Sequence, residues 1–191
     1  MIRFFSVVSV VSVFQLFAFI VFPQEAVARP SAAQVEAAFT PGDDVAGMIT
    51  QRIAKATKSV QMQAYLLTDR TIATALIAAR RRGLQVEVIG DAAQFEAGGL
   101  PWLAALHRAG ARTYLNTSNA ASHNKIVILD AAMPGATVIT GSYNFTQAAQ
   151  SKNAENVVII SRSPAVTGRF VENFEKFEGV PDEVVAAGPR I

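Results

Sequence analysis

The residues best suited to chemistry lie in one short stretch, Ser122–Asp130, which reads Ser-His-Asn-Lys-Ile-Val-Ile-Leu-Asp. In an extended strand alternate side chains share a face, so the imidazole of His123 and the ammonium of Lys125 should project to the same side. The apolar run Ile126–Leu129 should anchor that strand in the core and hold the pair rigidly. An imidazole beside a fixed cation is suited to act on an anionic group.

A second stretch, Gly141–Thr146, adds small and amide side chains after another apolar run. Ser142 and Asn144 offer hydrogen bonds, and Thr146 can cap a short helix through about Ser151. A helix that starts after a glycine turn presents free backbone N–H groups, which suit phosphate oxygens. The two stretches together predict an anion cradle beside a nucleophile.

This combination resembles the phospholipase D superfamily. His123-x-Lys125-x4-Asp130 is similar to its signature, and Gly141-Ser142-x-Asn144 is similar to its companion motif. The stretch around Glu155 resembles the place where the family has a supporting glutamate, and residues 65–68 and 82–91 look like its first half. The resemblance covers most of residues 35–177. One departure is the ten-residue spacing between Asp130 and Gly141, which is longer than usual, and a longer hairpin there costs little.

The resemblance implies covalent catalysis without a metal or other cofactor. One histidine attacks phosphorus and forms a phosphohistidine, while a second protonates the leaving oxygen and later activates water. His123, Lys125, Ser142 and Asn144 would contact the substrate. Glu155 would orient His123 and set its tautomer, and Asp130 would be a structural partner of the motif.

The second histidine is expected to come from a second copy of the chain. The sequence has two histidines, and His107 lies on an expected helix without a lysine two residues later. A two-fold axis through the site would supply the second His123, which predicts a homodimer.

The hydrophobic pattern predicts an α/β fold with a mixed parallel and antiparallel sheet flanked by helices on both faces. Thr68 is expected to cap the second helix and Gly83 to end it. Helices are expected over residues 43–57, from 68 to about 82, over 100–109 and over 164–177, and strands over 59–65, 84–89, 112–115, 126–129, 137–140 and 157–160.

Residues 1–28 read as a secretory signal, with Arg3, an apolar run over residues 4–22 and the small residues Ala26-Val27-Ala28. The alternative is an uncleaved membrane anchor, because the run is nearly long enough to span a bilayer. Either fate puts residues 29–191, one catalytic domain, outside the cytoplasm, in the periplasm or the medium. The chain has no cysteine, which excludes thiolate metal sites and a cysteine nucleophile.

The motif indicates cleavage of a phosphodiester, but it does not indicate whether the substrate is a nucleic acid or a phospholipid. A nonspecific endonuclease acting on DNA or RNA is the first interpretation, because no segment resembles a base-reading helix. A phospholipase D with the same residues is the alternative, although no amphipathic membrane-docking segment is evident after the signal. Arg80–Arg82 is interpreted as a solvated helix end, with a contact to DNA phosphates as the alternative.

Overall fold

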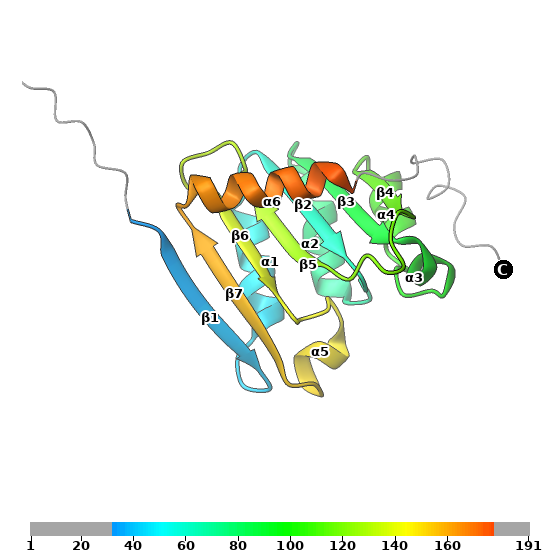
Figure 1. Ribbon diagram of the computed structural model, residues 1–191. Helices are drawn as coiled ribbons and strands as arrows, with labels where there is room; N and C mark the ends of the chain where they lie inside the picture. The colour runs from blue at the N-terminus through cyan, green and yellow to red at the C-terminus, as the bar shows by residue number, and fades with distance from the viewer. Residues whose placement is uncertain (1–31, 178–191) are drawn as a thin grey trace, which may run out of the picture. The chain divides into compact units, whose positions relative to one another are not determined.

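The structure, a computed structural model, describes residues 32–177; the expected signal, residues 1–28, lies outside this range. The described residues form one sheet and six helices (Figure 1). The strands are β1 (Gln34–Thr40), β2 (Ser59–Ala64), β3 (Gln85–Asp91), β4 (Arg112–Asn116), β5 (Lys125–Leu129), β6 (Thr137–Gly141) and β7 (Glu155–Ser161). The helices are α1 (Val45–Lys55), α2 (Arg70–Arg81), α3 (Ala92–Glu96), α4 (Leu103–Arg108), α5 (Gln147–Ser151) and α6 (Pro164–Lys176).

The strands lie in the order β1-β7-β6-β5-β2-β3-β4. β2, β3 and β4 are parallel, and every other neighbouring pair is antiparallel. We call the two ends of the sheet the amino end and the carboxyl end, after the direction of β2–β4. β5 starts at the carboxyl end, because Lys125 lies opposite Ala64, the last residue of β2. The predicted mixed sheet is confirmed.

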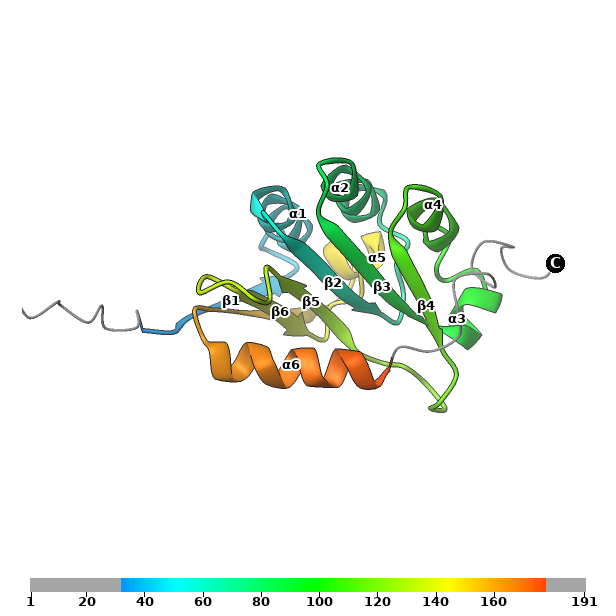
Figure 2. The same cartoon turned by 90° about the horizontal axis from the view of Figure 1, so that it is seen from above.

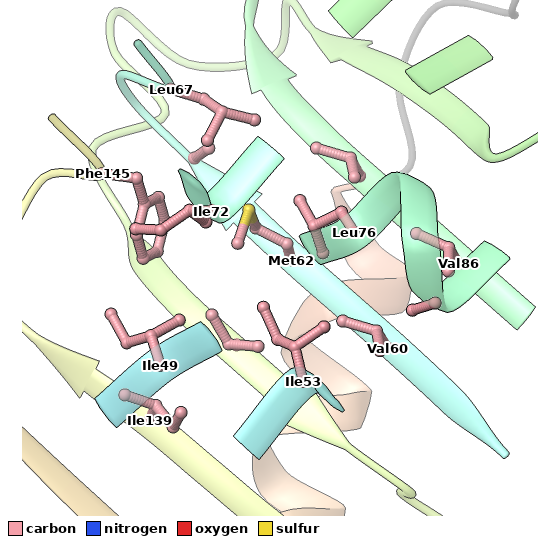
Figure 3. Packing of buried hydrophobic residues seen from close by; sticks show 14 of the residues in the cluster. Ile49, Ile53, Val60, Met62, Leu67, Ile72, Leu76, Val86, Ile139 and Phe145 are labelled. Atoms are coloured by element: carbon pink, nitrogen blue, oxygen red, sulfur yellow. The ribbon is translucent and has the colours of Figure 1, made fainter. Parts of the chain in front are cut away.

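Helices cover both faces of the sheet, as the sequence predicts. α1, α2 and α4 cover one face and α6 crosses the other (Figure 2). The side chains of β2 alternate between the two faces of the sheet. Val60 and Met62 enter the larger core, whereas Gln61 and Gln63 face α6. In that larger core Val60 and Met62 pack against Ile49 and Ile53 of α1 and Leu76 of α2 (Figure 3).

The structure corrects three details of the expected elements. β1 was not expected, because its residues are largely exposed and it joins the sheet only through β7, which is distant in sequence. The cap of α2 is Asp69, whose carboxylate accepts hydrogen bonds from the N–H groups of Thr71 and Ile72, whereas Thr68 donates its N–H to the Phe145 carbonyl. α4 begins at Leu103, three residues later than expected, and the short helix α3 precedes it.

Asp130 ties the end of β5 to the start of β2. Its carboxylate accepts hydrogen bonds from the backbone N–H groups of Thr57, Lys58 and Ser59, at 2.7–3.1 Å, and from the Thr57 hydroxyl at 3.1 Å. Burial alone would raise the pKa of this carboxyl, but the hydrogen bonds from Lys58, Thr57 and Ser59 outweigh it and the pKa lies below its usual value. The structural role expected for Asp130 agrees with these contacts.

We predict that Asp130→Ala lowers the free energy of unfolding by about 2 kcal/mol near pH 7, because it removes a charged acceptor of several hydrogen bonds. The folded pKa is depressed, so this contribution is complete above the unfolded pKa of about 3.9 and is lost as pH falls through the folded pKa. Urea unfolding at pH 7 and at successively lower pH measures both effects.

The matched control is Glu96→Ala, which removes an exposed carboxylate. It should leave the free energy of unfolding within about 0.5 kcal/mol of the parent. An Asp130→Ala protein that loses stability in acid as steeply as the parent would contradict the role of this clamp.

Candidate active site

His123 and Lys125 meet at the carboxyl end of the sheet. The amino group of Lys125 lies 2.9 Å from Nδ1 of His123 and also donates a hydrogen bond to the His123 carbonyl. Lys125 is buried in the sheet, while the ring of His123 is exposed. The sequence prediction that the two side chains reach the same place agrees with this geometry. A buried cation therefore sits behind an imidazole that a substrate can reach.

The protonation state of this pair decides what the ring can do. If Lys125 is an ammonium it donates to Nδ1, and the neutral ring then carries its proton on Nε2, which can be given to a leaving group. If Nδ1 carries the proton instead, Nε2 has a free lone pair and can attack. Burial lowers the pKa of Lys125, and the nearby carboxylate of Glu155 partly opposes that shift.

Ser142, Asn144 and Glu155 come to the same end from β6 and β7. The hydroxyl of Ser142 donates to Glu155 Oε2 at 2.5 Å and accepts from the N–H of Asn156 at 3.1 Å. The side-chain oxygen of Asn144 is buried and has no hydrogen-bond partner among residues 32–177. An unpaired polar atom of this kind is costly unless a ligand or a second chain satisfies it.

Gly141 permits this close arrangement of β6 and β7. A Cβ atom at this position would lie 2.1 Å from the carbonyl oxygen of Asn156, far inside contact distance. The small residue expected here from the sequence is thus required by the backbone of the neighbouring strand. It lets Ser142 reach both Glu155 and Asn156.

Within one chain Glu155 contacts Ser142 and Asn153, and its expected role in orienting His123 stays a prediction. The two oxygens of Glu155 accept hydrogen bonds from Ser142 and from the side chain of Asn153, at 3.0 Å for the latter. Among the described residues no hydrogen bond joins Glu155 to His123, and Nδ1 of the ring faces Lys125. Within one chain the partner that contacts the imidazole is therefore Lys125, while Glu155 acts on the pair through its charge.

The helix start that the sequence predicts as a phosphate site belongs to a short helix in the structure. Thr146 caps α5, as predicted, by accepting a hydrogen bond from the Ala149 N–H at 3.1 Å. The helix has only five residues, so its dipole is small. An anion at this end would be held mainly by side chains, those of Lys125, Ser142 and Asn144.

Three site residues were not identified from the sequence. The ring of Tyr65 lies 4.4 Å from that of His123, centre to centre, and 4.9 Å from the Lys125 amino group. Gln94 donates a hydrogen bond to the Tyr65 hydroxyl at 3.0 Å. Asp91 accepts from the N–H groups of Gln94 and Ser122, at 2.8 and 2.7 Å. Tyr65 follows β2 and Asp91 ends β3. Each lies beside the Ser122–His123 segment, which is 30 to 60 positions away in the sequence, so no local pattern signals this proximity.

Several other candidate residues lie away from His123. Asp130 follows β5 at the amino end, five strand residues from Lys125, or about 16 Å. His107 on α4 pairs with the Thr113 hydroxyl at 3.3 Å, which agrees with its structural assignment. Arg80 and Arg82 bind backbone carbonyl groups at the amino end, which favours the helix-end interpretation of this run. Within residues 32–177 no three His, Cys, Asp or Glu side chains cluster as a metal site would need.

Comparison with known proteins agrees with this geometry. Residues 49–177 match the family model described as cardiolipin synthase, PLD-like domain. The phospholipase D of Rickettsia typhi is 38% identical over 130 residues, 68% of this chain and 61% of that protein, so the chain spans about three fifths of this relative.

Solved structures show the same fold. The phospholipase D family member Nuc from Salmonella typhimurium superposes with a TM-score of 0.71 at 29% identity, covering 78% of this chain and 98% of Nuc. NucT from Helicobacter pylori gives a TM-score of 0.59 at 19% identity over 78% of this chain and 99% of NucT, a likeness of fold alone. With the family model matching about two thirds of its length, the chain belongs to the phospholipase D superfamily.

Proposed function

We propose that the protein is an exported, metal-independent endonuclease that cleaves phosphodiesters through His123 in a homodimeric site. One observation carries the proposal: an exposed imidazole with its Nδ1 against a buried lysine, at the end of the sheet where Ser142 and Asn144 also lie. This is an arrangement for attack on an anionic centre with neutralisation of its oxygens.

The proposed reaction has two steps. Nε2 of one His123 attacks phosphorus and the bond from phosphorus to the leaving oxygen breaks. The other His123 gives that oxygen its Nε2 proton while Nδ1 of the same ring takes a proton from the Lys125 ammonium beside it. Water then attacks the phosphohistidine and gives a proton to Nε2 of the second ring, Nδ1 returns its proton to Lys125, and the phosphorus–nitrogen bond breaks. The amide N–H groups of Asn144 stabilise the charge on the phosphoryl oxygens in both transition states.

The second imidazole is assigned to a second copy of the chain. His107 is the other histidine of this chain, and it is held at α4 by Thr113. The exposure of His123 leaves the ring accessible to another chain, and a two-fold axis near it would bring two equivalent rings to one phosphate. The two tautomers described above then correspond to the attacking and the protonating ring.

A nucleic acid is the preferred substrate class. Binding through the phosphate backbone requires only cations and amides at the site and gives little sequence preference. The alternative, a phospholipase D, is favoured by two observations. The Rickettsia relative carries that name, and Phe39, 59% exposed, pairs with Asn156 beside the site, where an apolar side chain could meet a lipid.

We predict that His123→Ala lowers phosphodiester cleavage at least roughly 10⁴-fold, because the ring supplies both the nucleophile and the acid. Cleavage by the parent protein should persist in EDTA. Plasmid nicking measures both results. His107→Ala is the matched control and should keep the parent rate. Cleavage that survives in His123→Ala would exclude the mechanism.

A mixing experiment tests the shared site. If each site needs two His123 rings, exchange with a ninefold excess of His123→Ala chains should lower activity per parent chain to about one tenth, since about one parent chain in ten then finds a parent partner. Sedimentation should show a dimer at the same concentrations. An activity per parent chain that does not change on mixing would mean that one chain carries a complete site.

The substrate class is decided by a direct comparison. We expect the protein to cleave plasmid DNA in EDTA and to release little choline from phosphatidylcholine vesicles under the same conditions. His123→Ala should abolish whichever activity is found. Choline release without DNA cleavage would establish the phospholipase alternative with the same mechanism.

A further inference from the structure

Charges differ between the two ends of the sheet. The amino end, opposite His123, carries a cluster of basic side chains, most of them in or just after the last turns of three helices. We call this the basic end, and it includes the exposed or half-buried residues Arg52, Lys55, Lys58, Arg81, Arg108 and Arg162. It also exposes Glu36, which pairs with Arg52. The carboxyl end exposes the acidic residues Asp43, Asp44 and Glu96 together with the cations Arg70 and Lys152.

Helix dipoles explain only part of this difference. Arg52, Lys55, Arg81 and Arg108 lie at helix C-termini, where a cation is favourable without any ligand. Lys58 and Arg162 lie in connections. Arg162 even holds a left-handed backbone, with φ of 59°, a conformation that glycine adopts more readily.

The basic end also carries an exposed apolar tip. The β5–β6 hairpin, the segment that is longer than usual for the family, places Met133 at its turn with 40% of its surface exposed. Beside it lies a largely apolar groove of about 680 Å³, lined by residues 131–134 and by Pro164, Gly168, Val171 and Glu172 of α6. Loop tips that combine an apolar side chain with nearby cations suit the boundary between lipid headgroups and acyl chains.

The chain enters the fold at this same end. Gln34, the first residue of β1, lines a groove of about 730 Å³ together with Glu36, Arg52, Lys55 and Arg162.

We propose that the basic end docks on an anionic lipid surface, with Met133 at the acyl boundary and the cations among the headgroups. The inference concerns orientation and does not depend on which phosphodiester is cleaved. Nucleic acid would account for the cations but not for the apolar tip. His123, at the opposite end, then faces the aqueous side, where a soluble polymer can reach it.

The absence of cysteine makes the orientation measurable in the full chain. A bimane probe is attached to Met133→Cys or, as the matched control, to Glu96→Cys on α3 at the carboxyl end. Each protein is reconstituted into vesicles of phosphatidylglycerol and phosphatidylcholine that carry nitroxide lipids. We expect the probe at Met133 to shift to the blue and to be quenched, and the probe at Glu96 to change little.

A charge test accompanies the probe. The double variant Lys55→Gln with Arg162→Gln should lower the ratio of docked to undocked protein about 30-fold, because each lost cation lowers this ratio roughly fivefold. Arg70→Gln with Lys152→Gln, two exposed cations of the carboxyl end, should leave it unchanged. The proposal would be overturned if the probe at Met133 stayed unquenched on vesicle-bound protein, or if the probes at both positions were quenched equally. It would also be overturned if DNA, and not vesicles, changed the fluorescence of the probe at Met133. Hydrolysis assays in solution are independent of these outcomes.

Discussion

The contact between the amino group of Lys125 and the ring of His123 is the interaction on which the site depends. A buried ammonium is costly unless its charge is compensated. The compensation comes from the His123 carbonyl, the face of the Tyr65 ring and the carboxylate of Glu155. These groups offset the cost of burying the lysine. Through Lys125 and the Tyr65 ring they also hold the imidazole of His123 in place.

β5 links this contact to the stability of the domain. Its five residues are all buried, with Lys125 at one end and Asp130 immediately after the other. Val127 and Leu129 pack into the larger core, and Ile126 and Ile128 face α6. Because β5 is packed on both faces and its end is fixed by the hydrogen bonds of Asp130, we expect the backbone at Lys125 to be rigid. This rigidity is what preorganised stabilisation of a charged transition state requires.

The two ends of the sheet differ in the side chains that they carry. At the carboxyl end β2, β3, β5, β6 and β7 contribute site residues, which agrees with the general placement of ligands beyond the carboxyl ends of parallel strands. At the amino end the helix C-termini collect cations, and the hairpin after Asp130 adds an apolar tip. One architecture thus separates a reactive end from an end suited to hold a surface, about one strand length apart.

The sequence by itself determined the family and the mixed fold, because motif spacing and the alternation of apolar residues are local properties. It predicted His123, Lys125, Ser142 and Asn144 as site residues. It also indicated the structural role of Asp130. Only the tertiary structure decided that Lys125 rather than Glu155 contacts the ring, and that Tyr65, Gln94 and Asp91 belong to the site. It likewise decided the cap at Asp69, the strand β1 and the gathering of cations at one end. These features arise from pairing between segments far apart in the chain, and local pattern carries no information about which distant segments become neighbours.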